Sequence, residues 1–178
     1  MIAFEVVAEE VKWRGRLLRA GVETYHYSDG TRNTFDRVWH PGAVAVIAYD
    51  DTHLWLVRQP REAARLHASL ELPAGKRDRD GESPLELARR ELAEEVGKRA
   101  GSWRELFSFY PSAGYSDEQV TLFAATGLGD LEQGASPEED EHIEIVPWPL
   151  GEIAAALAAT VDAKTLIGLL WLERELGR

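Results

Sequence analysis

The most informative stretch of this sequence reads Arg90-Glu91-Leu92-Ala93-Glu94-Glu95-Val96-Gly97. On a helix, Glu91 and Glu95 lie one turn apart on one face, and Glu94 lies close beside them. Carboxylates gathered in a small volume repel one another unless a cation compensates them, and Mg²⁺ binds such oxygens and bridges to phosphates. An isolated Glu-Glu pair would more simply be a solvated helix face. Because this pattern is longer, it predicts a metal site.

The residues around this stretch predict where its helix begins and ends. Ser83 suits the N-cap, Pro84 the first helical position and Glu86 the third position of a capping box. Gly97 suits the C-terminal cap. At helical spacing, one apolar stripe is predicted to be buried and to turn the glutamates elsewhere; it consists of Leu85, Ala88, Leu92 and Val96.

Outside this helix the chain is predicted to be rich in strands. β-Branched and aromatic residues indicate strands at 5–8, 16–19, 22–27, 34–39, 43–49, 54–58, 103–110, 119–126 and 143–148. Residues 60–68 are expected to be helix-like or a loop, and two helices, over 150–159 and 163–176, are expected to close the chain. The order predicts an α+β sandwich preceded by an antiparallel β piece. We expect residues 1–40 to form that piece and residues 41–178 the main domain.

Composition limits the classes of function. The 178 residues contain no cysteine, which excludes disulfides, thiolate metal sites and a cysteine nucleophile. A formal charge of -11 argues against nucleic-acid binding, and an acidic protein that acts on a phosphate needs metal ions between the two negative partners. The longest apolar runs, such as Ala43 to Tyr49, are too short to cross a membrane, and the N-terminus has no secretory pattern. A soluble, cytoplasmic protein is expected.

The glutamate stretch and the residues before it together resemble the signature of the Nudix hydrolases. That signature runs Gly, five residues, Glu, seven residues, Arg-Glu, aliphatic, any residue, Glu-Glu, any residue, Gly, aliphatic. Here it is carried by Gly75, Glu82, Arg90, Glu91, Glu94, Glu95 and Gly97. The chain departs from it in two places: six residues separate Gly75 from Glu82, and Lys98 replaces the final aliphatic residue. Neither departure removes a carboxylate.

The resemblance implies a Nudix-type α/β/α sandwich and a role for each residue of the signature. Glu91 and Glu95 would be the principal metal ligands, with Glu94 and the backbone carbonyl of Ala74 as further ligands. Two or three Mg²⁺ ions, or Mn²⁺ in their place, are expected in each site. Glu82 and Arg90 would hold the loop against the helix, and Gly75 and Gly97 would have structural roles in the motif.

A second segment narrows the branch of the family. Residues 110–118 are similar to the Pro-Gly-aromatic-Ser-Asp-Glu loop of the ADP-ribose pyrophosphatases, with Ala113 where the branch usually has proline. By this resemblance, Gly114 would contact substrate and Glu118 would be the catalytic base or a metal partner. A loop surface carboxylate is the simpler interpretation of Glu118.

The same branch implies further substrate contacts and a dimer. Arg61 would bind the diphosphate, and Glu141, in the acidic loop over 132–141, would approach the site. Arg37 and the aromatic residues Trp13, Tyr25, Tyr27 and Trp39 are candidates for base or ribose contacts, although packing explains each aromatic equally well. The N-terminal strands would exchange between two subunits of a homodimer. The motif Asp162-Ala163-Lys164-Thr165, which opens the last helix, also matches the branch.

The expected function is therefore Mg²⁺-dependent hydrolysis of ADP-ribose, or a similar ADP-sugar, to AMP and ribose 5-phosphate. Other nucleoside diphosphate derivatives are alternative substrates, among them nucleotide sugars, NADH, dinucleotides, and flavin or coenzyme A compounds. A Nudix module that binds a nucleotide without hydrolysing it is a further alternative. Intact Glu91, Glu94 and Glu95 make the enzyme the preferred hypothesis.

Overall fold

The computed structural model describes residues 2–136 and 142–177, and the chain forms two compact units. The first unit comprises Met1–Gly42 and Tyr110–Gln119, and the second comprises Ala43–Phe109 and Val120–Arg178. The loop over 110–119 is thus grouped with the N-terminal strands, whereas the sequence assigned it to the main domain. In the part of the chain that is described, no helix has the length and apolar character needed to span a bilayer.

The first unit is built on a three-stranded antiparallel sheet in the order β1-β2-β3. Its strands are β1 (Phe4–Arg14), β2 (Arg19–Tyr27) and β3 (Arg32–Trp39). The strand expected at 16–19 is wrong: that segment is mostly the turn between β1 and β2, closed by a hydrogen bond from the Gly15 N–H to the Leu18 carbonyl (2.9 Å). Between β2 and β3, Gly30 adopts a positive φ of 87°, which glycine accepts without strain.

The second unit is built on a mixed seven-stranded sheet with the central order β10-β5-β4-β9-β8. Its strands are β4 (Ala43–Tyr49), β5 (His53–Arg61), β6 (Leu66–Glu71), β7 (Ala74–Lys76), β8 (Lys98–Phe109), β9 (Val120–Asp130) and β10 (Glu144–Pro149). β4 runs parallel to β9, while β6 pairs with β5 and β7 pairs with β4.

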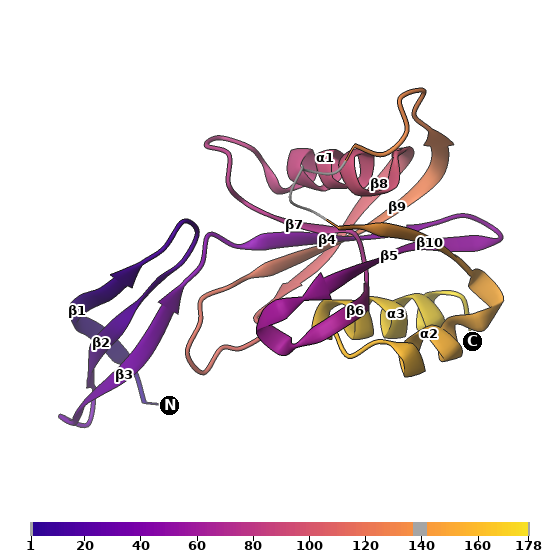
Figure 1. The fold of residues 1–178 in the computed structure, drawn as a ribbon. Coiled ribbons are helices and arrows are strands. Elements are labelled where there is room, and N and C mark those ends of the chain that lie inside the picture. The colour runs from indigo at the N-terminus through magenta and orange to yellow at the C-terminus, as the bar shows by residue number, and fades with distance from the viewer. Residues whose placement is uncertain (1, 137–141, 178) are drawn as a thin grey trace. The chain divides into compact units, whose positions relative to one another are not determined.

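Helices cover both faces of this sheet (Figure 1). α1 (Pro84–Val96) lies on one face, and α2 (Ile153–Ala159) and α3 (Ala163–Glu175) lie on the other. Side chains alternate along β4, so that Val44 and Val46 pack in the core beneath α1 while Ala45 and Ile47 pack in the core beneath α3. The uninterrupted apolar run of β4 therefore serves two cores, and the predicted α/β/α sandwich is confirmed.

The segment expected to be helix-like or a loop over 60–68 is mostly extended. β5 continues to Arg61, a 3-10 turn covers Glu62–Ala64, and β6 begins at Leu66. Arg65 adopts a left-handed conformation (φ 57°) at the end of that turn. Pairing between β5 and β6 extends the residues on either side of this turn.

Gly168 on α3 allows the helix to pack closely on the sheet. A Cβ at this position would lie 2.6 Å from Leu72 Cδ1 and 3.3 Å from Ile47 Cγ1, both in fully buried side chains. We predict that Gly168→Ala lowers the free energy of unfolding, because overpacking costs about 1–3 kcal/mol against a helix-propensity gain of at most about 1 kcal/mol. Urea unfolding measures it. Gly151→Ala is the control because open space surrounds that position; an equal effect of both changes would contradict the close-packing argument.

Candidate active site

Helix α1 begins and ends as the sequence predicts. The Ser83 side chain accepts a hydrogen bond from the Glu86 N–H, and the Glu86 carboxylate accepts one from the Ser83 N–H (2.9 Å), which completes the capping box. Gly97 takes the left-handed conformation with φ 68°. A Cβ there would also collide with the backbone of Ala135. Glycine is therefore required at position 97 by both conformation and space.

The buried face of α1 differs from the predicted stripe. Leu87, rather than Leu85, is fully buried, and Glu91 and Glu95 are themselves only 8% and 3% exposed. These two carboxylates lie between the helix and β7 instead of facing solvent. Because glutamate is ordinarily a surface residue, the apolar periodicity of α1 could not show that Glu91 and Glu95 are buried.

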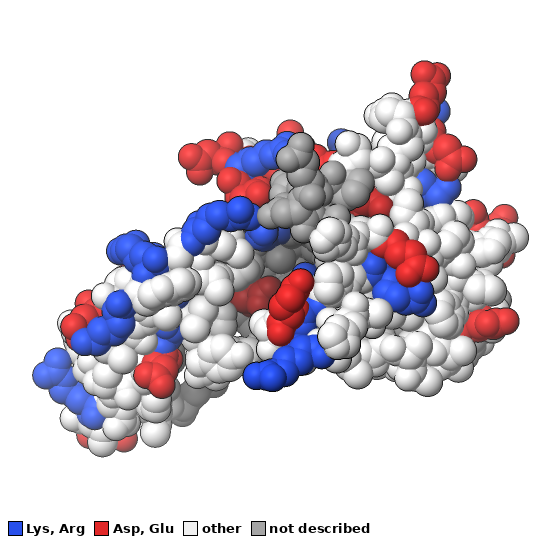
Figure 2. Space-filling model, in the orientation of Figure 1, with Lys and Arg blue, Asp and Glu red and all other residues white. Residues whose placement is uncertain are grey.

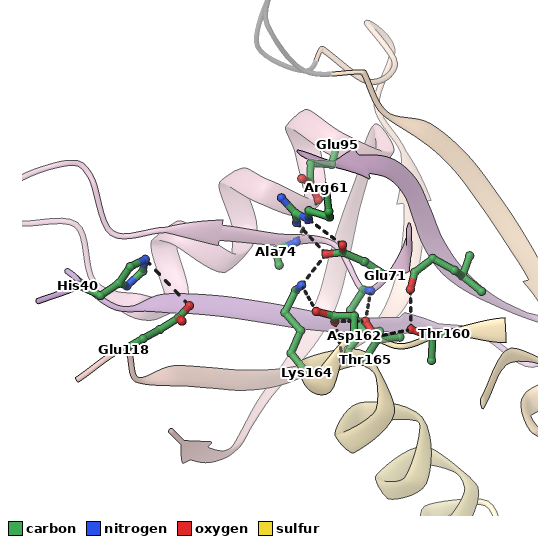
Figure 3. A network of polar contacts seen from close by, with 12 residues as sticks. His40, Arg61, Glu71, Ala74, Glu95, Glu118, Thr160, Asp162, Lys164 and Thr165 are labelled. Atoms are coloured by element: carbon green, nitrogen blue, oxygen red, sulfur yellow. Dashed lines mark hydrogen bonds and ion pairs between the residues drawn. The ribbon is translucent and has the colours of Figure 1, made fainter. Parts of the chain in front are cut away.

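The start of β7, at Ala74 and Gly75, holds both carboxylates in place. Glu95 Oε2 accepts a hydrogen bond from the Ala74 N–H (3.0 Å; Figure 3). A Cβ on residue 75 would occupy the same space as the Glu91 carboxylate, so the absence of a side chain on Gly75 makes room for it. This glycine serves close approach rather than an unusual backbone conformation.

Arg90 ties the loop before α1 to the helix. Its Nε and Nη2 donate to the two carboxylate oxygens of Glu82 (2.9 and 3.0 Å), and Nη1 donates to Glu94 (3.0 Å) and lies 2.9 Å from Glu91. The hydrogen bond to Glu82 is the main cause of a raised pKa of Arg90, and the same bond lowers the pKa of Glu82. Asp78, on the lengthened loop, also lies 3.3 Å from Nη2.

The donor set of α1 and β7 suits a divalent cation in its chemistry. The carboxylates of Glu91 and Glu95 and the backbone carbonyls of β7 are the hard oxygen ligands that Mg²⁺ prefers. Acidic side chains outnumber arginines here, and Glu94 also lies 3.6 Å from Arg79. Over residues 2–136 and 142–177, however, no three acidic or histidine side chains are arranged as a metal-holding group. The expected convergence of three glutamates is not seen, because Glu91 and Glu94 turn to Arg90 and Glu95 turns to Ala74.

The replacement of the last aliphatic position by Lys98 has a structural explanation. The Lys98 ammonium lies 2.6 Å from Asp130 and 4.4 Å from the centroid of the Trp55 ring. The side chain is largely buried, so its stem packs as an aliphatic chain would while the charge is held by an ion pair and a cation–π contact.

Arg61, the predicted diphosphate contact, binds Glu71, a partner that the sequence did not predict. Its Nε and Nη2 donate to the two oxygens of Glu71 at 2.7 Å each, and Lys164 donates to one of those oxygens at 2.5 Å (Figure 3). Burial would raise the pKa of Glu71, but the hydrogen bond from Arg61 and the charge of Lys164 lower it to about 2. The hydrogen bond to Glu71 also raises the pKa of Arg61, with smaller contributions that include the charge of Glu95.

In the first unit, Arg37 and Gly114 line one pocket of about 460 Å³ together with aromatic residues. The aromatic lining consists of Phe4, Tyr25, Tyr27, Phe35 and Tyr115. Arg37 Nη2 lies 3.0 Å from Asp117, whereas its buried Nε makes no hydrogen bond within the described part of the chain and lies 3.4 Å from Glu23. Trp13 and Trp39 do not line this pocket: Trp13 is exposed, and Trp39 is buried beneath Arg19.

Glu118, the predicted base, also belongs to the first unit and faces His40. The His40 Nδ1 accepts a hydrogen bond from the Gly42 N–H (3.0 Å), so the neutral ring carries its hydrogen on Nε2, which lies 4.0 Å from Glu118 Oε1. The sequence did not identify His40, because the five histidines show no metal-ligand spacing. Glu141, the remaining predicted contact, lies outside the described residues.

Charge on the surface shows no gathering of one sign on the face in Figure 2. Lys and Arg side chains of the described residues are scattered among Asp and Glu on that face. On this face the described residues therefore form no basic patch of the kind that follows a nucleic-acid backbone.

Known proteins match the chain along most of its length. A family model described as the NUDIX domain matches residues 39–167. The chain is 33% identical over 172 residues to the ADP-ribose pyrophosphatase of Bacillus subtilis (strain 168), covering 95% of this chain and 92% of that protein. Identity and coverage are the same for the methanol dehydrogenase activator of Bacillus methanolicus.

A solved structure agrees with these sequence matches. The crystal structure of an ADP compounds hydrolase superposes with a TM-score of 0.82 and 27% identity, over 97% of this chain and 93% of that one. The matched region contains the whole glutamate signature and the capped helix that carries it. The chain therefore belongs to the Nudix family and is a Nudix pyrophosphohydrolase.

Proposed function

We propose that this enzyme hydrolyses the diphosphate of ADP-ribose, or of a similar ADP-sugar, to AMP and ribose 5-phosphate. The observation that carries the proposal is the pair of buried carboxylates, Glu91 and Glu95, held against Ala74 and Gly75 of β7. The relatives named above as an ADP-ribose pyrophosphatase and an ADP compounds hydrolase support the substrate class.

Nudix hydrolases generally use divalent metal ions, and we propose Mg²⁺, with Mn²⁺ as a substitute, at two or three ions per site. Glu91 and Glu95, assisted by Glu94 and the Ala74 carbonyl, would hold them. A bound ion would act as a Lewis acid on the diphosphate and lower the pKa of a bound water. Arg90 would assist these ligands, because its hydrogen bonds to Glu82 and Glu94 hold the loop before α1 against the helix.

Other side chains are proposed to bind substrate and to move protons. Arg61 presents a partly exposed guanidinium, which can bind phosphate oxygens with two parallel bonds. Glu118 would take the proton from the attacking water, with the Nε2–H of His40 facing its carboxylate. Arg37, Gly114 and the aromatic pocket would bind the adenosine half. The buried Nε of Arg37 supports this assignment, because it lies 3.4 Å from Glu23 but makes no hydrogen bond in the described part of the chain, and a buried donor normally has an acceptor. We keep Glu141 as a further proposed contact.

A homodimer through the N-terminal strands is also proposed. Large apolar side chains are exposed on this sheet: Phe4, Val6, Val7, Trp13 and Phe35. Apolar patches of this kind mark interaction surfaces, and strands that exchange between subunits would cover them. The cytoplasm is the proposed location, because the absence of cysteine is compatible with a reducing compartment.

The test of the proposed function is a hydrolysis panel. ADP-ribose, ADP-glucose, GDP-mannose, NADH, diadenosine polyphosphates and coenzyme A are offered with and without Mg²⁺, and the products are identified by mass. We expect AMP and ribose 5-phosphate only when Mg²⁺ is present. Turnover of another compound replaces the substrate, and binding without turnover of any compound favours the non-catalytic module.

Glu91→Gln and Glu95→Gln are each predicted to lower turnover roughly 100-fold or more, since loss of outer-shell groups around a metal already costs 10–100-fold. Glu86→Gln is the matched control on the same helix, because glutamine preserves the capping box. Steady-state kinetics at saturating Mg²⁺ measures the effect. Wild-type turnover in Glu95→Gln would refute its assignment as a ligand.

Glu118→Gln is predicted to lower kcat by about 10²–10⁴, the usual contribution of a general base, with a smaller change in KM. Glu105→Gln, which removes an exposed carboxylate from β8, is the control. If the change appears in KM alone, Glu118 is a binding residue and the base must be sought elsewhere.

The dimer is tested by sedimentation velocity. We expect the wild-type chain to sediment as a dimer and the double variant Val7→Glu and Trp13→Glu to shift towards monomer, because charge on the exposed sheet opposes its burial. Leu170→Glu changes an exposed leucine on α3 and should leave the dimer intact. A wild-type monomer at all concentrations would contradict the proposal.

A further inference from the structure

The motif Asp162-Ala163-Lys164-Thr165 has no part in the function proposed so far, yet it enters a buried polar cluster. We define the Glu71 cluster as Arg61, Glu71, Asp162, Lys164 and Thr165. Asp162 caps α3: its Oδ2 accepts hydrogen bonds from the N–H and the hydroxyl of Thr165 (2.9 and 2.6 Å). The Thr165 hydroxyl in turn accepts the Leu72 N–H (2.8 Å; Figure 3). The cluster thus joins α3 to the chain that leads from β6 to β7.

Lys164 and Arg61 share one carboxylate. Glu71 is 1% exposed, and both of its oxygens are bound by Arg61, while its Oε2 also accepts a hydrogen bond from Lys164. A bidentate Arg–carboxylate pair is nearly neutral as a unit, which weakens the attraction of that arginine for a further anion. Lys164 supplies a second positive charge to the same carboxylate and so leaves the shared unit cationic.

Asp162 adds a second negative charge to the cluster, and this charge contributes to the raised pKa of Arg61. Although Asp162 Oδ1 accepts a hydrogen bond from Lys164 (2.9 Å), its other oxygen is taken by the first turn of α3. The positive end of the helix dipole compensates a carboxylate at that position. With Asp162 counted, the cluster holds two cations and two carboxylates, so Lys164 offsets negative charge near Arg61 without making the cluster cationic.

Arg61 is placed to use this charge. Its side chain is 42% exposed, although Glu71 holds its Nε and Nη2. It lines a pocket of about 480 Å³ whose other polar lining residues are Glu62, Ser69, Glu71 and Asp162. A guanidinium that is oriented from behind and open in front is pre-organised for an anion, because little side-chain entropy is lost on binding.

We propose that Lys164 is a positioning residue for the diphosphate contact of Arg61. Glu71 orients the guanidinium, and Lys164 shares the charge of Glu71 so that Arg61 keeps its attraction for the diphosphate of the substrate. The inference rests on the proposed role of Arg61 in binding that diphosphate.

The test measures binding of inorganic pyrophosphate to the full chain in Mg²⁺ by calorimetry, so it does not depend on turnover. Lys164→Met is expected to weaken binding about tenfold, the scale of one unit charge acting over several ångströms near a protein surface. Lys164→Arg retains the charge and should bind within about twofold of wild type on the same scale. The loss in Lys164→Met should shrink at high salt, because screening reduces the contribution of the missing charge.

A second substitution separates charge sharing from a scaffold role. In the double variant Lys164→Met and Glu71→Gln, both the ammonium and the carboxylate charge are gone, so Arg61 recovers its net charge and pyrophosphate affinity should rise above that of Lys164→Met. A purely structural role predicts the opposite, since the double variant removes two buried contacts. Equal or weaker binding by the double variant overturns the proposal. Thermal melting checks that each variant is folded.

Two further variants complete the design. Arg58→Met removes a cation from the same strand, paired there with Glu144, and should leave affinity unchanged. Arg61→Met should abolish most of the affinity; an unchanged value would overturn the inference at its premise. Failure of the proposed function appears separately, as absence of ADP-ribose hydrolysis in the substrate panel while the pyrophosphate results keep the expected order.

Discussion

The contact on which the rest of the site depends is the close approach of α1 to Ala74 and Gly75 of β7. Glu91 fills the space that a side chain on residue 75 would take, and Glu95 accepts the Ala74 N–H. Burying two carboxylates is unfavourable unless donors or cations compensate them. The capped helix and the neighbouring strand pair β4/β7 provide the rigid frame that keeps these carboxylates near the backbone.

In the second unit, arginine and lysine side chains bind the carboxylates around Arg90 and in the Glu71 cluster. Arg90 is bound by several acidic groups and fixes the loop before α1, while Arg61 and Lys164 hold a single buried carboxylate, Glu71. The two arrangements have different consequences. Excess acidic charge around Arg90 suits the binding of cations, whereas around Glu71 two cations balance two carboxylates and leave the guanidinium of Arg61 partly exposed.

Local signals in the sequence predicted the parts of the fold that depend on local physics. The capping box at Ser83, the cap at Gly97 and the apolar run of β4 follow from neighbouring residues, and all appear in the structure. The Glu71 cluster was not predicted, because Lys164 is 93 positions from Glu71 and only tertiary folding brings them together. Leu87, Glu91 and Glu95 follow one another at helical spacing on the buried side of α1, and this side was missed because glutamate is ordinarily a surface residue.

The loop between Gly75 and Glu82 has its two ends fixed by separate contacts. Gly75 is held by the approach of Glu91, and Glu82 by the two hydrogen bonds from Arg90, while Asp78 and Arg79 between them make longer contacts to Arg90 and Glu94. A chain anchored independently at both ends can change its length without moving either anchor, and the entropic cost of one extra residue is small. The loop therefore accommodates the additional residue while Gly75 and Glu82 keep their contacts. This loop is also a natural place to graft a recognition peptide or a fluorophore site beside the carboxylates without rebuilding them.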